Sequence, residues 1–167
     1  MNYYIDFDNT LFNTSLFANE IFGDYLSNID KLDKQKILLN LNEIISNSQK
    51  FVFPDSIPFL ENLRKKNKLF LLSYSNRNTK YQTAKILGSG LVDYFDGLYI
   101  TSIPKYELDI DYSNGIFIDD NPEDLKGLYS KNPQKLIRLR RKDTKYSGKD
   151  LDFTIEEYSN FDELQID

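Results

Sequence analysis

Short apolar runs alternate along the chain with longer segments in which apolar residues recur every three or four positions. The first pattern is typical of buried strands and the second of amphipathic helices. We predict strands at residues 3–7, 69–72, 98–100, 116–118, 135–139 and 153–155. We predict helices at residues 14–27, 31–48, 77–87 and 122–129, one that opens at Asp55 or Ser56 and ends in 64–67, and a last turn near 160–165.

Local signals define the ends of several helices. Asp55 or Ser56 is expected to act as an N-cap, Gly88 to stop the helix before it, and Asn121-Pro122 to cap and begin the next one. Strands that alternate with helices predict an α/β fold with a parallel sheet and right-handed crossovers. Ligands of such sheets bind at the carboxyl ends of the strands.

The composition narrows the chemistry. The 167 residues correspond to about one domain, and 40% hydrophobic and 28% charged residues are typical of a globular protein. There is no Cys and no His, which excludes disulfides, thiolate nucleophiles, Ser-His-Asp triads and the usual zinc sites. Oxygen ligands remain, and these favour Mg²⁺ over Ca²⁺ or Mn²⁺.

Charge and hydropathy indicate where the protein acts. No apolar run approaches the roughly 20 residues that cross a bilayer, and the first residues lack the basic region of a signal peptide. We therefore expect a cytoplasmic protein without a membrane partner. The net charge of −5 argues against general nucleic-acid binding. A local basic run is interpreted as a strand leading into a solvated, charged end: Lys135, Arg138, Arg140, Arg141, Lys142 and Lys145.

Two acidic pairs follow predicted strands. Asp6 and Asp8 stand one residue apart after the first strand, and Asp119 and Asp120 are adjacent after the fourth. Taken alone, each pair also suits a turn, with Asp8 and Thr10 making local bonds. Carboxylates that repel each other at two strand ends are, however, what a divalent cation site requires.

Two further positions offer groups that bind a phosphoryl oxygen. Ser73 ends the second main strand, with Ser75 and Asn76 close behind, where turn chemistry alone would also explain them. Lys105 precedes the fourth strand; most lysines are solvated surface groups, but a carboxylate-rich site needs a cation beside the metal to bind a phosphate.

These pieces together resemble the haloacid dehalogenase superfamily. Asp6-Phe7-Asp8-Asn9-Thr10 resembles its first motif, Ser73 its second, Lys105 its third, and Asp119-Asp120 through Asp124 its fourth, in the same order. The resemblance implies a Rossmann-like three-layer sandwich formed by residues 1–11 and 53–167. Residues 12–52 then resemble the small helical cap that this superfamily often inserts after the first strand.

The resemblance also implies a role for each matched residue. Asp6 would be the nucleophile that forms an aspartyl-phosphate, and Asp8 the general acid and base. Mg²⁺ would be held by Asp6, the backbone carbonyl of Asp8, and Asp120, whose spacing to Asp124 fits the fourth motif better than that of Asp119. The resemblance further implies that Asp119 and Asp124 lie behind the metal ligands and support them. The residues that would bind the phosphate are Ser73, Asn76, Lys105 and Thr10. Lys80 or Lys85 could substitute for Lys105.

The expected activity is Mg²⁺-dependent hydrolysis of a phosphate monoester. An aspartate at the position of Asp8 resembles the phosphatases and phosphotransferases of this superfamily rather than its dehalogenase branch. A small phosphorylated substrate is expected, with a phosphorylated polymer end or protein as an alternative. Phosphotransfer, or a non-catalytic metal- or partner-binding module, is the competing hypothesis. The cap is expected to cover the catalytic mouth, with Phe12, Phe17 and Phe22 facing the acidic cluster.

Overall fold

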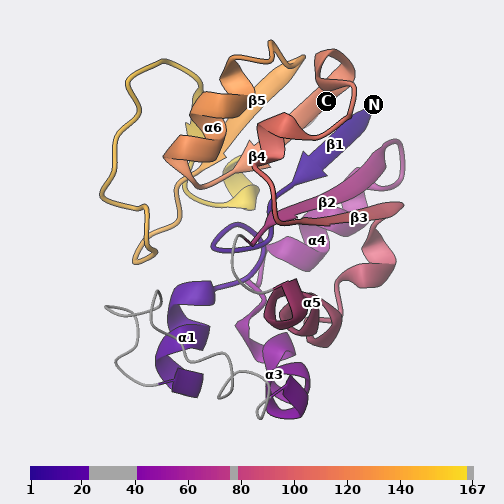
Figure 1. Ribbon diagram of the computed structural model, residues 1–167, viewed down its shortest axis with the longest axis vertical. Coiled ribbons are helices and arrows are strands. Elements are labelled where there is room, and N and C mark those ends of the chain that lie inside the picture. Colours follow the sequence, from indigo (N-terminus) through magenta and orange to yellow (C-terminus); the bar gives the residue numbers. More distant parts are fainter. Residues whose placement is uncertain (23–40, 76–78, 165–167) are drawn as a thin grey trace.

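A six-stranded parallel sheet organises the protein (Figure 1). The computed structural model describes residues 1–22, 41–75 and 79–164. The strand order is β3-β2-β1-β4-β5-β6, and every neighbouring pair is parallel. The strands are β1 (Asn2–Ile5), β2 (Lys68–Tyr74), β3 (Gly97–Thr101), β4 (Gly115–Asp119), β5 (Lys135–Leu139) and β6 (Glu156–Tyr158). The predicted α/β class is therefore confirmed.

Helices connect the strands. The α-helices are α1 (Thr14–Phe22), α3 (Leu41–Asn47), α4 (Ser56–Leu63), α5 (Thr79–Gly88) and α6 (Pro122–Tyr129). Short 3-10 turns are η2 (Ser48–Phe51), η3 (Val92–Tyr94), η4 (Lys105–Glu107), η5 (Tyr112–Asn114) and η6 (Phe161–Glu163). None of the helices in the described ranges is both long enough and apolar enough to span a bilayer.

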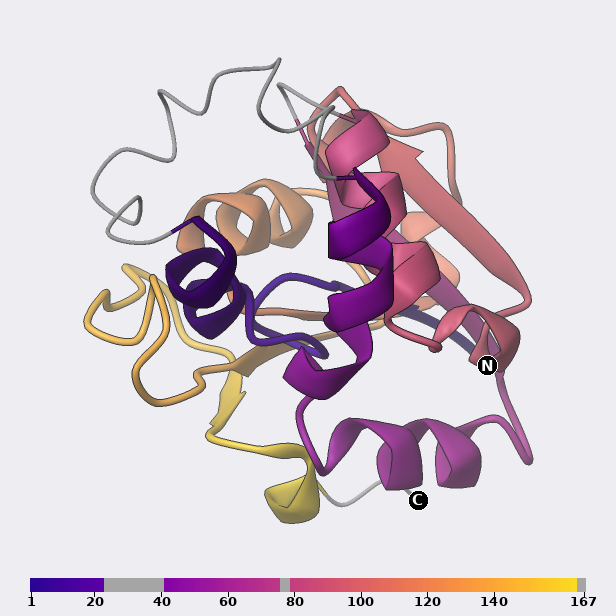
Figure 2. The same ribbon diagram turned by 90° about the horizontal axis from the view of Figure 1, so that it is seen from below.

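The two faces of the sheet bury separate hydrophobic clusters, because successive side chains of a strand point to opposite faces. Ile5, Leu71 and Ile118 pack with residues of α4 and α5. Tyr4 and Phe117 pack with Leu125 and Leu128 of α6 on the other face. The result is the predicted three-layer sandwich, with α4 and α5 on one side of the sheet and α6 on the other (Figures 1 and 2).

The described part of the 12–52 insertion packs closely onto the core. Phe12 and Phe17 are fully buried, and their rings lie 5.3 Å apart between centroids. Phe12 also stacks on Phe7 at 4.8 Å, so these rings extend the main core rather than line an open mouth. Residues 23–40 and the side chain of Phe22 lie outside the described part of the chain.

One predicted strand needs correction. The last strand lies at Glu156–Tyr158 and not at 153–155, because Phe153 and Ile155 pack against the second cluster instead. The helix α5 ends at Gly88 as predicted, although the positive φ that follows it belongs to Gly90 (φ 75). Gly88 is needed for another reason, since a Cβ there would lie 2.3 Å from the carbonyl oxygen of Ile45 in α3.

Candidate active site

Three carboxylates converge at the carboxyl edge of the sheet. Asp6 follows β1, while Asp119 ends β4 and Asp120 comes next. β1 and β4 are parallel neighbours with Ile5 opposite Ile118, and the Asp6 amide donates to the Ile118 carbonyl at 2.9 Å. Carboxylate oxygens of the three aspartates lie within 4.8 Å of one another. We call this set Asp6, Asp119 and Asp120 the acid cluster.

Lys105 is the cation of this site. Its side chain is 2% exposed, and its Nζ lies 2.5 Å from Asp6 Oδ1 and 2.6 Å from Asp119 Oδ2. Asp124 is more distant, at 3.6 Å. The η4 turn reaches this depth because it packs on α6 at Gly127, where a Cβ would lie 1.9 Å from the Tyr106 ring. The expected contact between Asp119 and Lys105 is thus present.

The three carboxyl groups are buried and close together, and both effects disfavour their ionised forms. Burial raises the pKa of Asp6 well above its ordinary value, and the charge of Asp119 adds to this while Lys105 opposes it. Burial likewise raises the pKa of Asp119 to about 6, against the lowering effect of Lys105. Burial is the largest cause that raises the pKa of Asp120, and the negative charges of Asp6 and Asp119 raise it further.

The acid cluster fits a hard divalent cation. Asp119 uses both carboxylate oxygens, with Oδ2 on Lys105 and Oδ1 accepting from the Asn121 amide at 2.9 Å. Asp120 Oδ2 is buried and has no hydrogen-bond partner among the residues that the structure describes. A buried acceptor without a donor is costly, and Mg²⁺ prefers such oxygen ligands. Asp120 is therefore better placed than Asp119 to bind a metal directly.

Asp8 belongs to a second network that faces α5. Its Oδ1 contacts the Lys85 ammonium and the Thr14 hydroxyl, and its Oδ2 accepts from Gln82 Nε2 at 2.5 Å. The same Gln82 amide donates to Ser73 Oγ at 2.7 Å. Burial alone would raise the pKa of Asp8, but Lys85 and these hydrogen bonds together lower it.

Sequence reasoning named Lys85 only as a substitute for Lys105 and did not find Gln82 or Thr14. The available signal was their spacing in α5: Gln82 and Lys85 are three residues apart, so they share one helix face. Both are almost completely buried, with 3% and 1% exposed. Lys80, the other predicted substitute, is exposed. Lys105 and Lys85 therefore serve different aspartates.

The loop after β1 is tightly closed. The amides of Leu11 and Phe12 donate to the Phe7 carbonyl at 3.1 and 3.0 Å. Asn9 has a φ of 57, and its Oδ1 accepts from the amide and hydroxyl of Ser15. Thr10 is fully buried, and its hydroxyl has no partner within the described ranges. Asn76, predicted to contact phosphate, lies outside the described residues.

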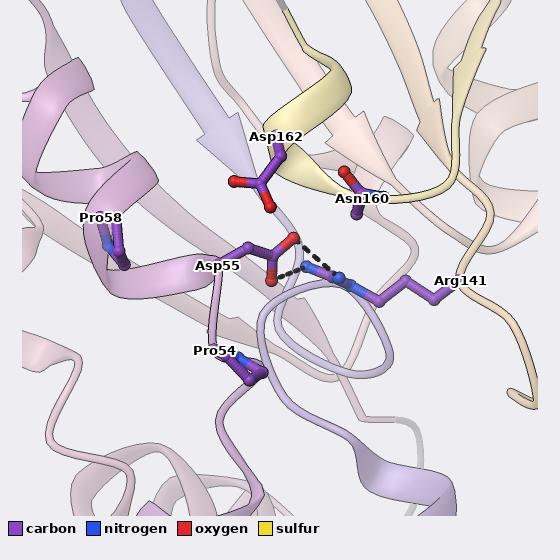
Figure 3. A pocket seen from close by; sticks show the side chains of 6 residues that line it. All are labelled: Pro54, Asp55, Pro58, Arg141, Asn160 and Asp162. Atoms are coloured by element: carbon purple, nitrogen blue, oxygen red, sulfur yellow. Dashed lines mark hydrogen bonds and ion pairs between the residues drawn. The ribbon is translucent and has the colours of Figure 1, made fainter.

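The prediction that the basic run forms a solvated end is wrong for two of its members. Arg138 and Arg141 are 0% and 5% exposed. Arg141 makes a bidentate ion pair with Asp55 at 2.9 and 3.0 Å, and its Nε donates to the Thr10 carbonyl at 2.8 Å (Figure 3). Asp55 precedes α4 but makes no N-cap bond, because its carboxylate accepts from Arg141 and from the Phe161 amide.

The Arg141–Asp55 pair borders a shallow hollow lined by Pro54, Pro58, Asn160 and Asp162 (Figure 3). No residue of the acid cluster lines this hollow. The hollow is consequently separate from the candidate chemistry.

Solved structures similar to this chain share one architecture. The HAD-hydrolase YfnB from Bacillus subtilis, bound to magnesium, superposes with a TM-score of 0.67 over 97% of this chain and 95% of its own, at 9% identity. A haloacid dehalogenase-like hydrolase from Burkholderia xenovorans gives 0.66 over 95% and 92%, at 18% identity. This chain has the haloacid dehalogenase fold.

L-2-haloacid dehalogenase from Xanthobacter autotrophicus shows the same fold at greater distance, with a TM-score of 0.53 over 84% of this chain and 77% of its own, at 15% identity. No sequence profile of a known family and no curated protein matches this chain. At such identities the comparisons establish the haloacid dehalogenase fold, and the chemistry has to be argued from the site.

Proposed function

We propose that this protein is a Mg²⁺-dependent phosphohydrolase that cleaves a phosphate monoester through an aspartyl-phosphate on Asp6. The observation that carries this proposal is that Asp6 and Asp8 have different sets of partners. Asp6 lies in the acid cluster beside Lys105, whereas Asp8 has its own partners, Lys85, Thr14 and Gln82. Two carboxylates in separate environments are what a nucleophile and a proton carrier require.

The metal would be held by Asp6, Asp120 and the backbone carbonyl of Asp8, with Asp119 and Asp124 behind them. When bound, Mg²⁺ supplies positive charge that stabilises the phosphoryl oxygens. Support comes from the mutual approach of the cluster carboxylates and from the unpartnered oxygen of Asp120 within the described residues. The magnesium bound to YfnB, which has the same fold, is consistent with this choice.

The reaction has two displacement steps. In the first, an Asp6 carboxylate oxygen forms a bond to phosphorus while the bond to the leaving oxygen breaks, and the protonated form of Asp8 gives that oxygen its proton. The Lys85 pair lowers the pKa of Asp8, so this protonated form is the minor one at neutral pH. In the second, a water attacks the phosphorus, Asp8 takes its proton, and the Asp6–phosphorus bond breaks. Inorganic phosphate leaves, and both aspartates return to their starting states.

Lys105 and Ser73 would hold the phosphoryl group during these steps, together with Thr10 and Asn76. Lys105 already orients Asp6 through the 2.5 Å contact with Oδ1. Ser73 is tied to Asp8 through Gln82, so the phosphate-binding hydroxyl and the proton carrier are positioned by one amide. The substrate is a small phosphorylated compound; a phosphorylated nucleic-acid end is the alternative that the net charge of −5 disfavours.

A phosphatase and a dehalogenase differ in whether the leaving group must be protonated as it departs. An alkoxide must be protonated as it leaves, and Asp8 is an acid two residues from the nucleophile. A halide leaves without a proton, so a dehalogenase has no use for this group. Release of chloride from 2-chloropropionate is therefore the contrasting assay.

The test is turnover of an aryl phosphate by the purified chain. Activity is expected with Mg²⁺, to disappear in excess chelator, and to fall on the order of 10³-fold or more in Asp6→Asn. Asp109→Asn, a change of the same charge at an exposed position, is the matched control and should keep full activity. Wild-type turnover by Asp6→Asn, or chloride release without phosphate release, would refute the assignment.

A further inference from the structure

A loop after β5 presents lysines that form no ion pair with any carboxylate in the part of the chain that the structure describes. Lys142, Lys145 and Lys149 stand between β5 and β6, and all three are exposed. Throughout residues 1–22, 41–75 and 79–164 none of the three forms an ion pair, whereas Arg138 and Arg140 pair with Glu157. We call residues 142–149 the basic loop.

The basic loop is held in one shape by arginines. The fully buried Arg138 donates through Nη2 to the carbonyls of Tyr146 and Lys149 at 3.0 and 2.7 Å. Arg140 Nε donates to the Ser147 carbonyl at 2.6 Å. Charged donors to backbone carbonyls make strong hydrogen bonds. These hydrogen bonds hold the backbone of the loop in one conformation, with its carbonyls directed at the arginines and its lysine side chains exposed to solvent.

The residue directly before the basic loop contacts the loop that follows β1. Arg141, directly before the loop, donates to the Thr10 carbonyl at 2.8 Å. In both views the gold segment that carries the loop lies near the end of the sheet at which α1 lies (Figures 1 and 2). The loop therefore runs beside the carboxyl edge, where the substrate must enter.

Tyr146 connects the lysines with the acid cluster. The Lys145 and Lys149 ammonium groups lie 4.9 and 5.3 Å from the centroid of its ring. Burial raises the pKa of the Tyr146 phenol and Lys145 lowers it, while the carboxylates of Asp120 and Asp124 are near enough to raise it further. Arg138 lies opposite Asp119 in the sheet and donates to the Tyr146 and Lys149 carbonyls, so both lysines belong to a stretch of loop that is held at the end of β5 beside β4.

We propose that the basic loop binds a second anionic group of the substrate, through Lys145 and Lys149. The inference rests on the proposed function and specifies its substrate class: phosphate monoesters that carry another phosphate or a carboxylate a few atoms from the reacting phosphoryl group. The reacting phosphoryl group occupies the acid-cluster end, and the second anion pairs with the two lysines.

Binding of phosphonates tests the proposal without turnover, because a carbon–phosphorus bond cannot be cleaved by this chemistry. The probes are butylphosphonate with one anionic group, 4-phosphonobutyrate with an added carboxylate, and 1,3-propanediphosphonate with an added phosphonate. Each is titrated into the full chain with Mg²⁺ by calorimetry. The wild type should bind at least one two-anion probe about tenfold more tightly than butylphosphonate, and the better of the two identifies the second group.

The variant is Lys145→Ala/Lys149→Ala, and the control is Lys65→Ala/Lys66→Ala. Lys65 and Lys66 are exposed and lie before the amino end of β2, so the control loses the same charge at the opposite edge. The advantage of the two-anion probe should disappear in the first variant and persist in the control, with butylphosphonate affinity equal in all three proteins.

Two results would overturn the proposal: an advantage that survives in Lys145→Ala/Lys149→Ala, or two-anion probes that bind the wild type no better than butylphosphonate. These results differ from failure of the proposed function. That failure would be an absence of aryl phosphate turnover, for which the basic loop is not required.

Discussion

Lys85 is a buried ammonium surrounded by aromatic rings. It lies 4.8 Å from the centroid of Tyr81 and 5.8 Å from those of Phe7 and Phe12, with Asp8 as its ion-pair partner. Removing an ammonium from water costs several kcal/mol, which a single good partner and the ring faces offset. The pair is therefore sensitive to the loss of either member, and it fixes the proposed proton carrier against α5.

The substitution Lys85→Met should be strongly destabilising. It keeps much of the side-chain volume but leaves the Asp8 carboxylate without a cation, and breaking a buried pair costs about 3–5 kcal/mol. The measurement is the free energy of unfolding in urea near neutral pH. Lys80→Met, on the same helix but exposed, should change it by less than about 0.5 kcal/mol. Equal effects of the two substitutions would mean that the Asp8–Lys85 pair contributes little.

At the scale of elements, Arg141 joins three segments that are remote in sequence. Its guanidinium pairs with Asp55 before α4, donates to the Thr10 carbonyl in the loop after β1, and lies 3.9 Å from the centroid of the Phe53 ring. Asp55 in turn accepts from the Phe161 amide at the start of η6. One ion pair thus ties the loop after β1 to α4 and to the C-terminal segment.

Breaking this pair should destabilise the protein and disturb the site. Arg141→Met and Asp55→Asn are each expected to cost about 3–5 kcal/mol of unfolding free energy, because each leaves a buried charge unpaired. The double variant should cost clearly less than the sum, since neither charge then remains. Arg64→Met, at an exposed arginine, is the control. Additive costs in the double-mutant cycle would show that the two side chains do not act together.

The elements themselves were largely predictable. Alternation and apolar runs located β1, β2, β4 and β5, and the position of the acids at strand ends predicted that Asp6 and Asp120 meet. Asn121 caps α6 as expected, accepting from the Glu123 amide. These predictions succeed because strand period and N-cap chemistry are local.

What the sequence did not predict depends on tertiary pairing. Lys85 contacts Asp8 across 77 positions and Arg141 contacts Asp55 across 86, and no local pattern pairs them. Asp55 therefore looked like an N-cap. The edge strand β6 was misplaced because its residues, Glu156–Tyr158, are polar and carry no apolar alternation, while nearby Phe153 and Ile155 do.

At the scale of the whole molecule, the protein folds around charges that repel one another. The acid cluster holds three carboxylates within 4.8 Å, with Lys105 as the ammonium in direct contact. Lys105 keeps its proton, since Asp119 and Asp6 raise its pKa although burial would lower it. Without a metal, three carboxylates share one ammonium in direct contact, so ionising all of them costs stability.

This imbalance predicts how the stability of the metal-free protein depends on pH. The pKa of Asp119 is raised to about 6 in the fold from an ordinary 3.8, and those of Asp6 and Asp120 are raised as well. Groups with raised pKa stabilise the fold fully below their unfolded value and lose that contribution as the pH rises through the folded value. Asp8, with a lowered pKa, acts in the opposite sense but only below about pH 4.

The chelated protein should therefore be less stable at about pH 7.5 than at about pH 5.5, by about 1 kcal/mol from Asp119 alone. Mg²⁺ should raise the melting temperature more at the higher pH, because protons and the metal compete for the same oxygens. Asp120→Asn should weaken both the pH dependence and the Mg²⁺ effect, while Asp109→Asn should keep both. A chelated wild type that grows more stable between these two pH values, or an Asp120→Asn protein that Mg²⁺ stabilises as fully as the wild type, would show that the acid cluster is not the metal site.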